Sequence, residues 1–111
     1  MAAIAWHDRF EEAGSVDEMV QVVREYVSSM EGEVRGRIPV TCRLDRIVRD
    51  DDIDDATYRL ADVTRERRDD TRLAEIFNHF LHASLRVSQM RRAQAQQAMA
   101  GAPRRFSRQM G

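Results

Sequence analysis

Apolar residues recur at helical spacing in the segment that follows Ser15. They fall within an arc of about 120° at 100° per residue, and the polar residues between them fall outside it. Ser15 and Glu18 have the spacing of a capping box, in which each side chain satisfies a free amide of the first turn. The pattern therefore predicts an amphipathic helix over residues 16–31 whose buried face is Val16, Met19, Val20, Val23, Tyr26, Val27 and Met30.

The longest helical pattern covers residues 70–100. It starts at Asp69, Asp70 and Thr71, and Gly101 and Pro103 mark its end. Its predicted buried stripe is Leu73, Ile76, Phe77, Phe80, Leu81, Ser84, Val87 and Ser88. A helix of this length measures about 45 Å, whereas a globule of this size has a radius of gyration of about 13 Å. Beyond residue 90 the apolar positions are alanines, so the last third either projects from the fold or pairs with another chain.

Three other segments have weaker patterns. Trp6 and Phe10 share one face of a predicted short helix over residues 2–13, and a thinner stripe predicts a third helix over residues 53–67. Glycines and Pro39 in residues 32–44 predict an ordered loop that leads into a short helix. Alternation in the same segment leaves a strand open, which would have to pair with its copy in a dimer.

These elements predict an all-α fold, a small bundle of three to four helices with one long C-terminal helix that overruns the monomer. We expect residues 1–100 to form one helical domain and residues 101–111 to form a basic, flexible tail. The overrun predicts a homodimer or a larger assembly. A single cysteine, Cys42, favours a reducing compartment, and the chain has no apolar run long enough for a bilayer, so the expected location is the cytoplasm.

Charge is distributed unevenly along the chain. The segment up to Glu75 contains twelve arginines and all nineteen acidic residues, so its net charge is −7. The segment from Ile76 onward contains six arginines and no acidic residue. An acidic body with a basic C-terminal arm suggests an acidic partner. All eighteen basic residues are arginine, which is explained by coding bias or by selection for guanidinium contacts.

The candidate partner-binding residues lie in this arm. They are Arg86, Arg91, Arg92, Arg104, Arg105, Arg108 and Phe106. The acidic partner is a second copy of the chain or another protein, with nucleic acid as an alternative. Antiparallel pairing of the long helices would place each basic arm near the acidic body of the other subunit. The remaining reading is a solvated tail without a partner.

Two groups of side chains have the spacing of metal ligands. Alternating aspartates at Asp50–Asp54 resemble a calcium loop, but Asp55 and Ala61 stand where that loop needs glycine and glutamate, so helix capping explains the run better.

Glu75, His79 and His82 lie on one helical face and could ligate zinc or iron. This face is predicted to point away from the core as a solvated surface, and His7 is too remote in sequence to count as a fourth ligand without a structure.

No signature of an enzyme family stands out. Cys42 is expected to be a small apolar residue of the core or a loop, and there is no phosphate-binding loop or nucleophile elbow. The sequence therefore favours a non-enzymatic helical interaction module without a cofactor and without a membrane partner. The alternatives are a nucleic-acid-binding protein and a metal-dependent enzyme or sensor.

Overall fold

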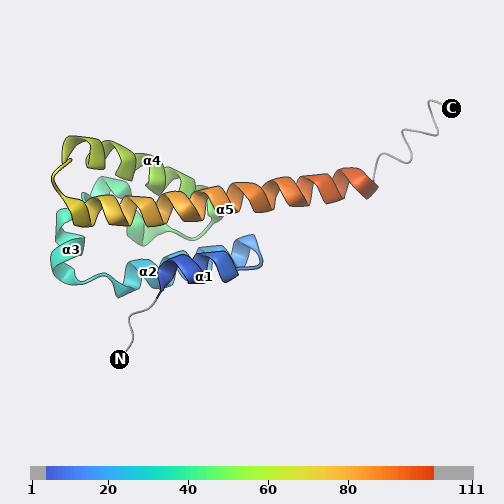
Figure 1. The fold of residues 1–111 in the computed structure, drawn as a ribbon, viewed down its shortest axis with the longest axis horizontal. Helices are drawn as coiled ribbons and strands as arrows, with labels where there is room; N and C mark the ends of the chain where they lie inside the picture. Colours follow the sequence, from blue (N-terminus) through green and yellow to red (C-terminus); the bar gives the residue numbers. More distant parts are fainter. Residues whose placement is uncertain (1–4, 102–111) are drawn as a thin grey trace.

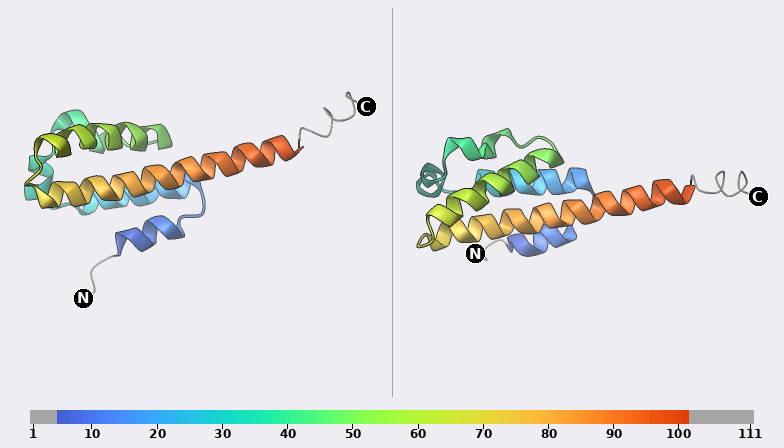
Figure 2. Two further views of the ribbon diagram at one scale, coloured as in Figure 1. Left: turned by 45° about the horizontal axis from the view of Figure 1, so that its top comes forward. Right: turned by 90° about the horizontal axis from the view of Figure 1, so that it is seen from above.

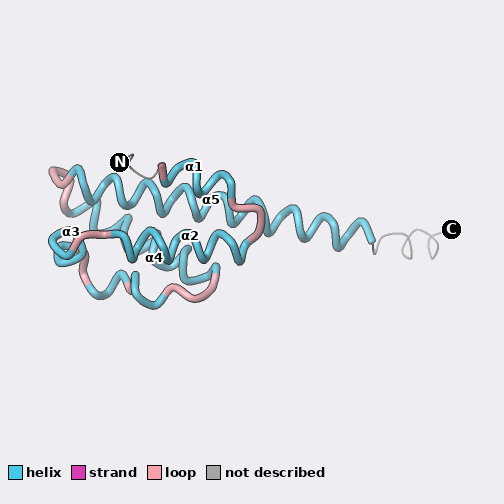
Figure 3. The backbone as a smooth tube through the Cα atoms, turned by 90° about the horizontal axis from the view of Figure 1, so that it is seen from below, coloured by secondary structure: helices cyan, strands magenta, loops and turns pink. Residues whose placement is uncertain are grey.

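The computed structural model describes residues 5–101, and the backbone of this range is helical, with no strand (Figure 3). The elements in chain order are α1 (Trp6–Glu12), α2 (Val16–Ser29), α3 (Gly32–Arg37), the short 3-10 turns η1 (Val40–Cys42) and η2 (Leu44–Arg46), α4 (Asp50–Glu66) and α5 (Thr71–Gly101). The all-α fold predicted from the sequence is confirmed.

Helix α5 organises the bundle. Figure 1 shows α1, α2 and α4 along its N-terminal part, while its C-terminal third continues beyond them. Figure 2 shows the same arrangement from two further sides. The residues from Arg92 to Met99 are all exposed. The small bundle with an overrunning C-terminal helix is therefore the observed architecture.

One core of apolar side chains lies between α1, α2, α4 and α5. Phe10 and Phe80 are its largest fully buried side chains. The ring of Tyr26 lies edge-on to Phe10, with 5.9 Å between ring centroids, and Trp6 packs on the outer side of Tyr26 at 5.2 Å. This aromatic group attaches α1 to the bundle, because Phe10 is the buried residue of that helix.

Capping side chains explain where the two main helices begin. The Ser15 hydroxyl accepts from the Glu18 amide at 3.1 Å, and the Glu18 carboxylate accepts from the Gly14 amide at 2.8 Å. At α5 the Asp70 carboxylate accepts from the Leu73 amide at 3.1 Å. Each of these bonds satisfies an amide that the helix itself leaves free. The predicted starts of α2 and α5 are confirmed.

The predicted limits of two other helices were less accurate. Helix α1 begins at Trp6, and residues 2–4 of the prediction lie outside the described range. Helix α4 begins at Asp50, three residues before the predicted start, so the aspartates form its first turn. The Asp52 carboxylate accepts from the Val48 and Arg49 amides at 2.9 and 3.0 Å, and these bonds lower its pKa.

The loop prediction for residues 32–44 was wrong at its start, where α3 forms despite two glycines. A side chain at Gly32 or Gly36 would meet open space, so neither glycine serves a close approach, and the helix is held by the buried Val34. The two 3-10 turns follow, separated by Arg43 in the left-handed conformation at φ 57°. Cys42 is fully buried, as expected, and burial raises the pKa of its thiol.

In the described part of the chain, no helix combines the length and apolar character needed to cross a membrane.

Candidate functional site

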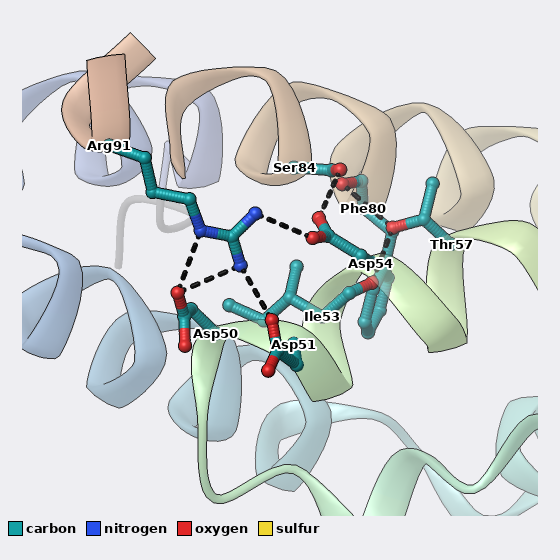
Figure 4. Close-up of polar contacts among 8 residues, drawn as sticks. All are labelled: Asp50, Asp51, Ile53, Asp54, Thr57, Phe80, Ser84 and Arg91. Atoms are coloured by element: carbon teal, nitrogen blue, oxygen red, sulfur yellow. Dashed lines mark hydrogen bonds and ion pairs between the residues drawn. The ribbon is translucent and has the colours of Figure 1, made fainter. Parts of the chain in front are cut away.

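Arg91 of α5 binds the acidic N-terminus of α4 (Figure 4). Its guanidinium donates to Asp50 and Asp54 at 2.8 Å and to Asp51 at 3.1 Å. Ser84, two turns earlier on α5, donates to the second oxygen of Asp54 at 2.7 Å. Arg91 lowers the pKa of Asp50 through this hydrogen bond. The charge contrast seen in the sequence is thus used inside one subunit at this point, to join α5 to α4.

We expect Arg91→Met to destabilise the fold by about 1–2 kcal/mol near neutral pH, because a partly exposed charge network is removed. A carboxylate with a lowered pKa stabilises the fold above its ordinary pKa, and this stabilisation is lost as the pH falls through the lowered value. The difference between wild type and variant should therefore shrink below about pH 4. Urea unfolding at a series of pH values measures it, with Arg59→Met, which removes an exposed pair with Asp55, as the control. A difference independent of pH would contradict the assignment.

Arg86 is also engaged within the subunit. It donates to the Ala13 carbonyl at 3.1 Å and lies 3.4 Å from the Glu11 carbonyl, both at the C-terminus of α1. Carbonyls at this end of a helix have no partner within the helix, and a cation there opposes the negative end of the dipole. Arg86 therefore holds α1 against α5.

Two of the predicted partner-binding arginines, Arg86 and Arg91, thus contact groups of their own subunit, and partner binding by the arm stays a prediction. Arg92 is exposed. The other predicted partner-binding residues, Arg104, Arg105, Arg108 and Phe106, lie outside the described residues, as does most of the predicted tail.

The predicted metal ligands Glu75, His79 and His82 do not converge on one point. Glu75 pairs with Arg72 at 3.0 Å. His79 Nδ1 lies 2.8 Å from the Tyr26 hydroxyl, and burial lowers the pKa of this histidine, which favours a ring that accepts a hydrogen bond from the hydroxyl. The expectation of a solvated face holds for the exposed Glu75 and fails for His79 and His82, which are half-buried against Tyr26 and α1.

His82 instead meets two residues of α1. Its Nε2 lies 2.7 Å from Oε1 of Glu11. The ring of His7 stacks on that of His82, with 4.3 Å between centroids and 26° between planes. One ligand atom from each of His7, Glu11 and His82 lies within 4.8 Å of the others. The sequence alone could not count His7 among the ligands, and the structure places it beside His82 because α1 folds back along α5.

A second candidate surface runs along the uncovered side of α5. Its residues alternate in steps of four and three, the spacing of a coiled-coil seam, and fall within an arc of about 80° at 100° per residue. They are Leu81, Leu85, Ser88, Arg92, Ala95 and Met99. We call this set the α5 seam.

The α5 seam contains the exposed large apolar side chains of α5 within the described range. Leu81 is 38% exposed, Leu85 56% and Met99 65%. Leu81 was predicted to be buried, and that was wrong because no helix of the bundle covers this side. The α5 seam can be found in the sequence only if its steps of four and three residues are searched for independently of the buried stripe of the same helix. The sequence interpretation missed the α5 seam because it assumed that the helix has a single apolar face.

Comparisons with protein families, with curated protein sequences and with solved structures found no match for this chain.

Proposed function

We propose that the protein is a non-enzymatic helical interaction module that forms an antiparallel homodimer through α5. One observation carries the proposal: the exposed apolar residues of α5 lie on a coiled-coil seam that extends into the part of the helix projecting from the bundle. Association removes such side chains from water, and a second copy offers a seam of the same spacing.

The α5 seam is self-complementary in one antiparallel register. A two-fold axis beside position 90 pairs each position with one equally far on the other side of residue 90 in the partner subunit. In these pairs a large residue faces another large residue or a small one. The facing pairs are Leu81 with Met99 of the partner subunit, Leu85 with Ala95 of the partner subunit, and Ser88 with Arg92 of the partner subunit. In this register the two bundles lie toward opposite ends of the paired helices, so each projecting end has room beside the other subunit.

Charge favours the same register. Ser88 lies one turn after Ser84 and three residues before Arg91, both of which contact the acidic first turns of α4. Arg92 of the partner subunit would enter beside these carboxylates, where Asp51 remains 81% exposed. The basic arm of one copy thus approaches the acidic body of the other.

Light scattering on the full chain tests the association, with twice the chain mass of 12.9 kDa expected. A clean monomer mass at high micromolar concentration would refute it. Cysteine pairs test the register under mild oxidation. Ser88→Cys combined with Arg92→Cys should cross-link two chains, whereas Leu81→Cys alone should not, because only a parallel pair brings position 81 next to its own copy. The reverse result would refute the antiparallel arrangement.

In the alternative form of this proposal, the interaction module binds a different protein instead of a second copy of the chain. A pull-down that compares the full chain with a chain ending at Gly101 tests whether the terminal arginines recruit one. The nucleic-acid alternative receives less support, since Arg86 and Arg91 contact groups of their own subunit. It requires salt-dependent retardation of DNA or RNA that is lost in the same truncation.

A further inference from the structure

We propose that His7, Glu11 and His82 form a zinc site that clips α1 to α5. Two imidazoles and one carboxylate are ligands that zinc accepts, and a water molecule can complete its four-coordinate shell. The proposal is independent of the dimer, because these residues lie on a different side of α5 from the α5 seam.

The three ligands come from two helices that the fold already holds together. His7 and Glu11 are four residues apart and therefore project from the same face of α1. His82 approaches them from α5, and its side chain is only 18% exposed. Phe10, fully buried between them, packs edge-on to His82 at 5.7 Å between centroids. The position of one ligand, His82, is thus set by packing, which reduces the ordering that an ion would have to impose.

The distances between the ligand atoms of His7, Glu11 and His82 allow them to bind one zinc ion after a small movement of the side chains. Zinc bonds of about 2.0–2.1 Å place tetrahedral ligands about 3.3 Å apart. The pair formed by Glu11 and His82, now at 2.7 Å, would open slightly as the ion takes the place of the shared proton. The remaining adjustment falls on His7, whose side chain is exposed and turns from the stacked position at little cost.

Within the described residues, the ring of His82 depends on Glu11 for its hydrogen bond. Its Nδ1 is buried and finds no hydrogen-bond partner within the described residues, so the ring makes its hydrogen bond there through Nε2. Arg86 approaches the other oxygen of Glu11 at 3.9 Å but is anchored on the Ala13 carbonyl. The positive charge of Arg86 repels a zinc ion bound beside it. We therefore expect weaker binding than at a four-ligand structural zinc site.

The plain alternative is that Glu11 and His82 form only a surface ion pair that docks α1. Titration of the untagged full chain with Co²⁺ separates the two. A zinc-type site should give saturable visible absorption of four-coordinate Co²⁺ at one ion per chain, and Zn²⁺ should displace it. Binding should weaken at acidic pH, because imidazole must be deprotonated to ligate. The emission of Trp6, the single tryptophan, reports whether α1 tightens.

Two variants decide the assignment. His7→Ala removes an exposed ligand without touching the core, and we expect it to weaken Co²⁺ binding at least about tenfold, since loss of even outer-shell partners costs that much. Glu12→Gln, which alters the neighbouring exposed carboxylate of α1, is the matched control and should bind like the wild type. Circular dichroism verifies that both variants fold. Absence of the visible band in the wild type, or equal binding by His7→Ala, would overturn the site. Dimer mass is not affected by either outcome, so the result is separate from the test of the proposed function.

Discussion

Leu85→Glu should convert the proposed dimer into a monomer. Leu85 is 56% exposed in the single subunit, so the substitution leaves the core intact. In the proposed dimer both copies of the side chain would be buried, and full burial of a leucine contributes about 1.5–3 kcal/mol. Because Leu85 is already partly covered in the single subunit, two copies per dimer predict a dissociation constant at least about tenfold higher. Sedimentation or light scattering over a dilution series measures the change.

The control for this variant adds the same charge elsewhere on α5. Gln97 is exposed and lies on the side of the helix away from the α5 seam, so Gln97→Glu should leave the dissociation constant nearly unchanged. If the masses of Leu85→Glu and the wild type agree at every concentration, the α5 seam is not the interface.

Phe10→Ala should produce the largest loss of stability that a single change in α1 can cause. Phe10 is fully buried and contacts the rings of Tyr26, His79 and His82. Removal of a buried phenylalanine costs about 3–5 kcal/mol. Helix α1 has only seven residues, too few to be helical in isolation, so the expected result is undocking of α1.

Urea unfolding and the emission of Trp6 measure this effect. Undocking should shift the Trp6 emission to longer wavelength, because the indole loses its contact with Tyr26. Glu12→Ala, an exposed change on the same helix, should stay within about 0.5 kcal/mol of the wild type. A loss of less than about 1 kcal/mol in Phe10→Ala would show that α1 does not depend on this anchor.

Local signals in the sequence were sufficient for the regular part of the fold. Helix α2 has a complete apolar face from Met19 to Val27 and a capping serine, and both signals act within a few residues of each other. Helix α5 likewise has an N-terminal aspartate and a periodic core stripe. The glycines near Val34 were misleading, because helix propensity is a small term that burial of one valine in the core can outweigh.

Contacts between distant residues determined the cluster of His7, Glu11 and His82 and the pairing of Arg91 with α4, and no local pattern revealed either of them. The overrun of α5 follows from the length of its periodic pattern, so the sequence alone determined that this helix must project or find a partner. Only the tertiary structure decided that Arg86 and Arg91 belong to the fold and that His7 meets His82, because both outcomes depend on α1 and α4 packing against different sides of α5. Helical periodicity describes the side of one helix that is apolar, whereas the crossing of four helices decides which polar side chains are covered.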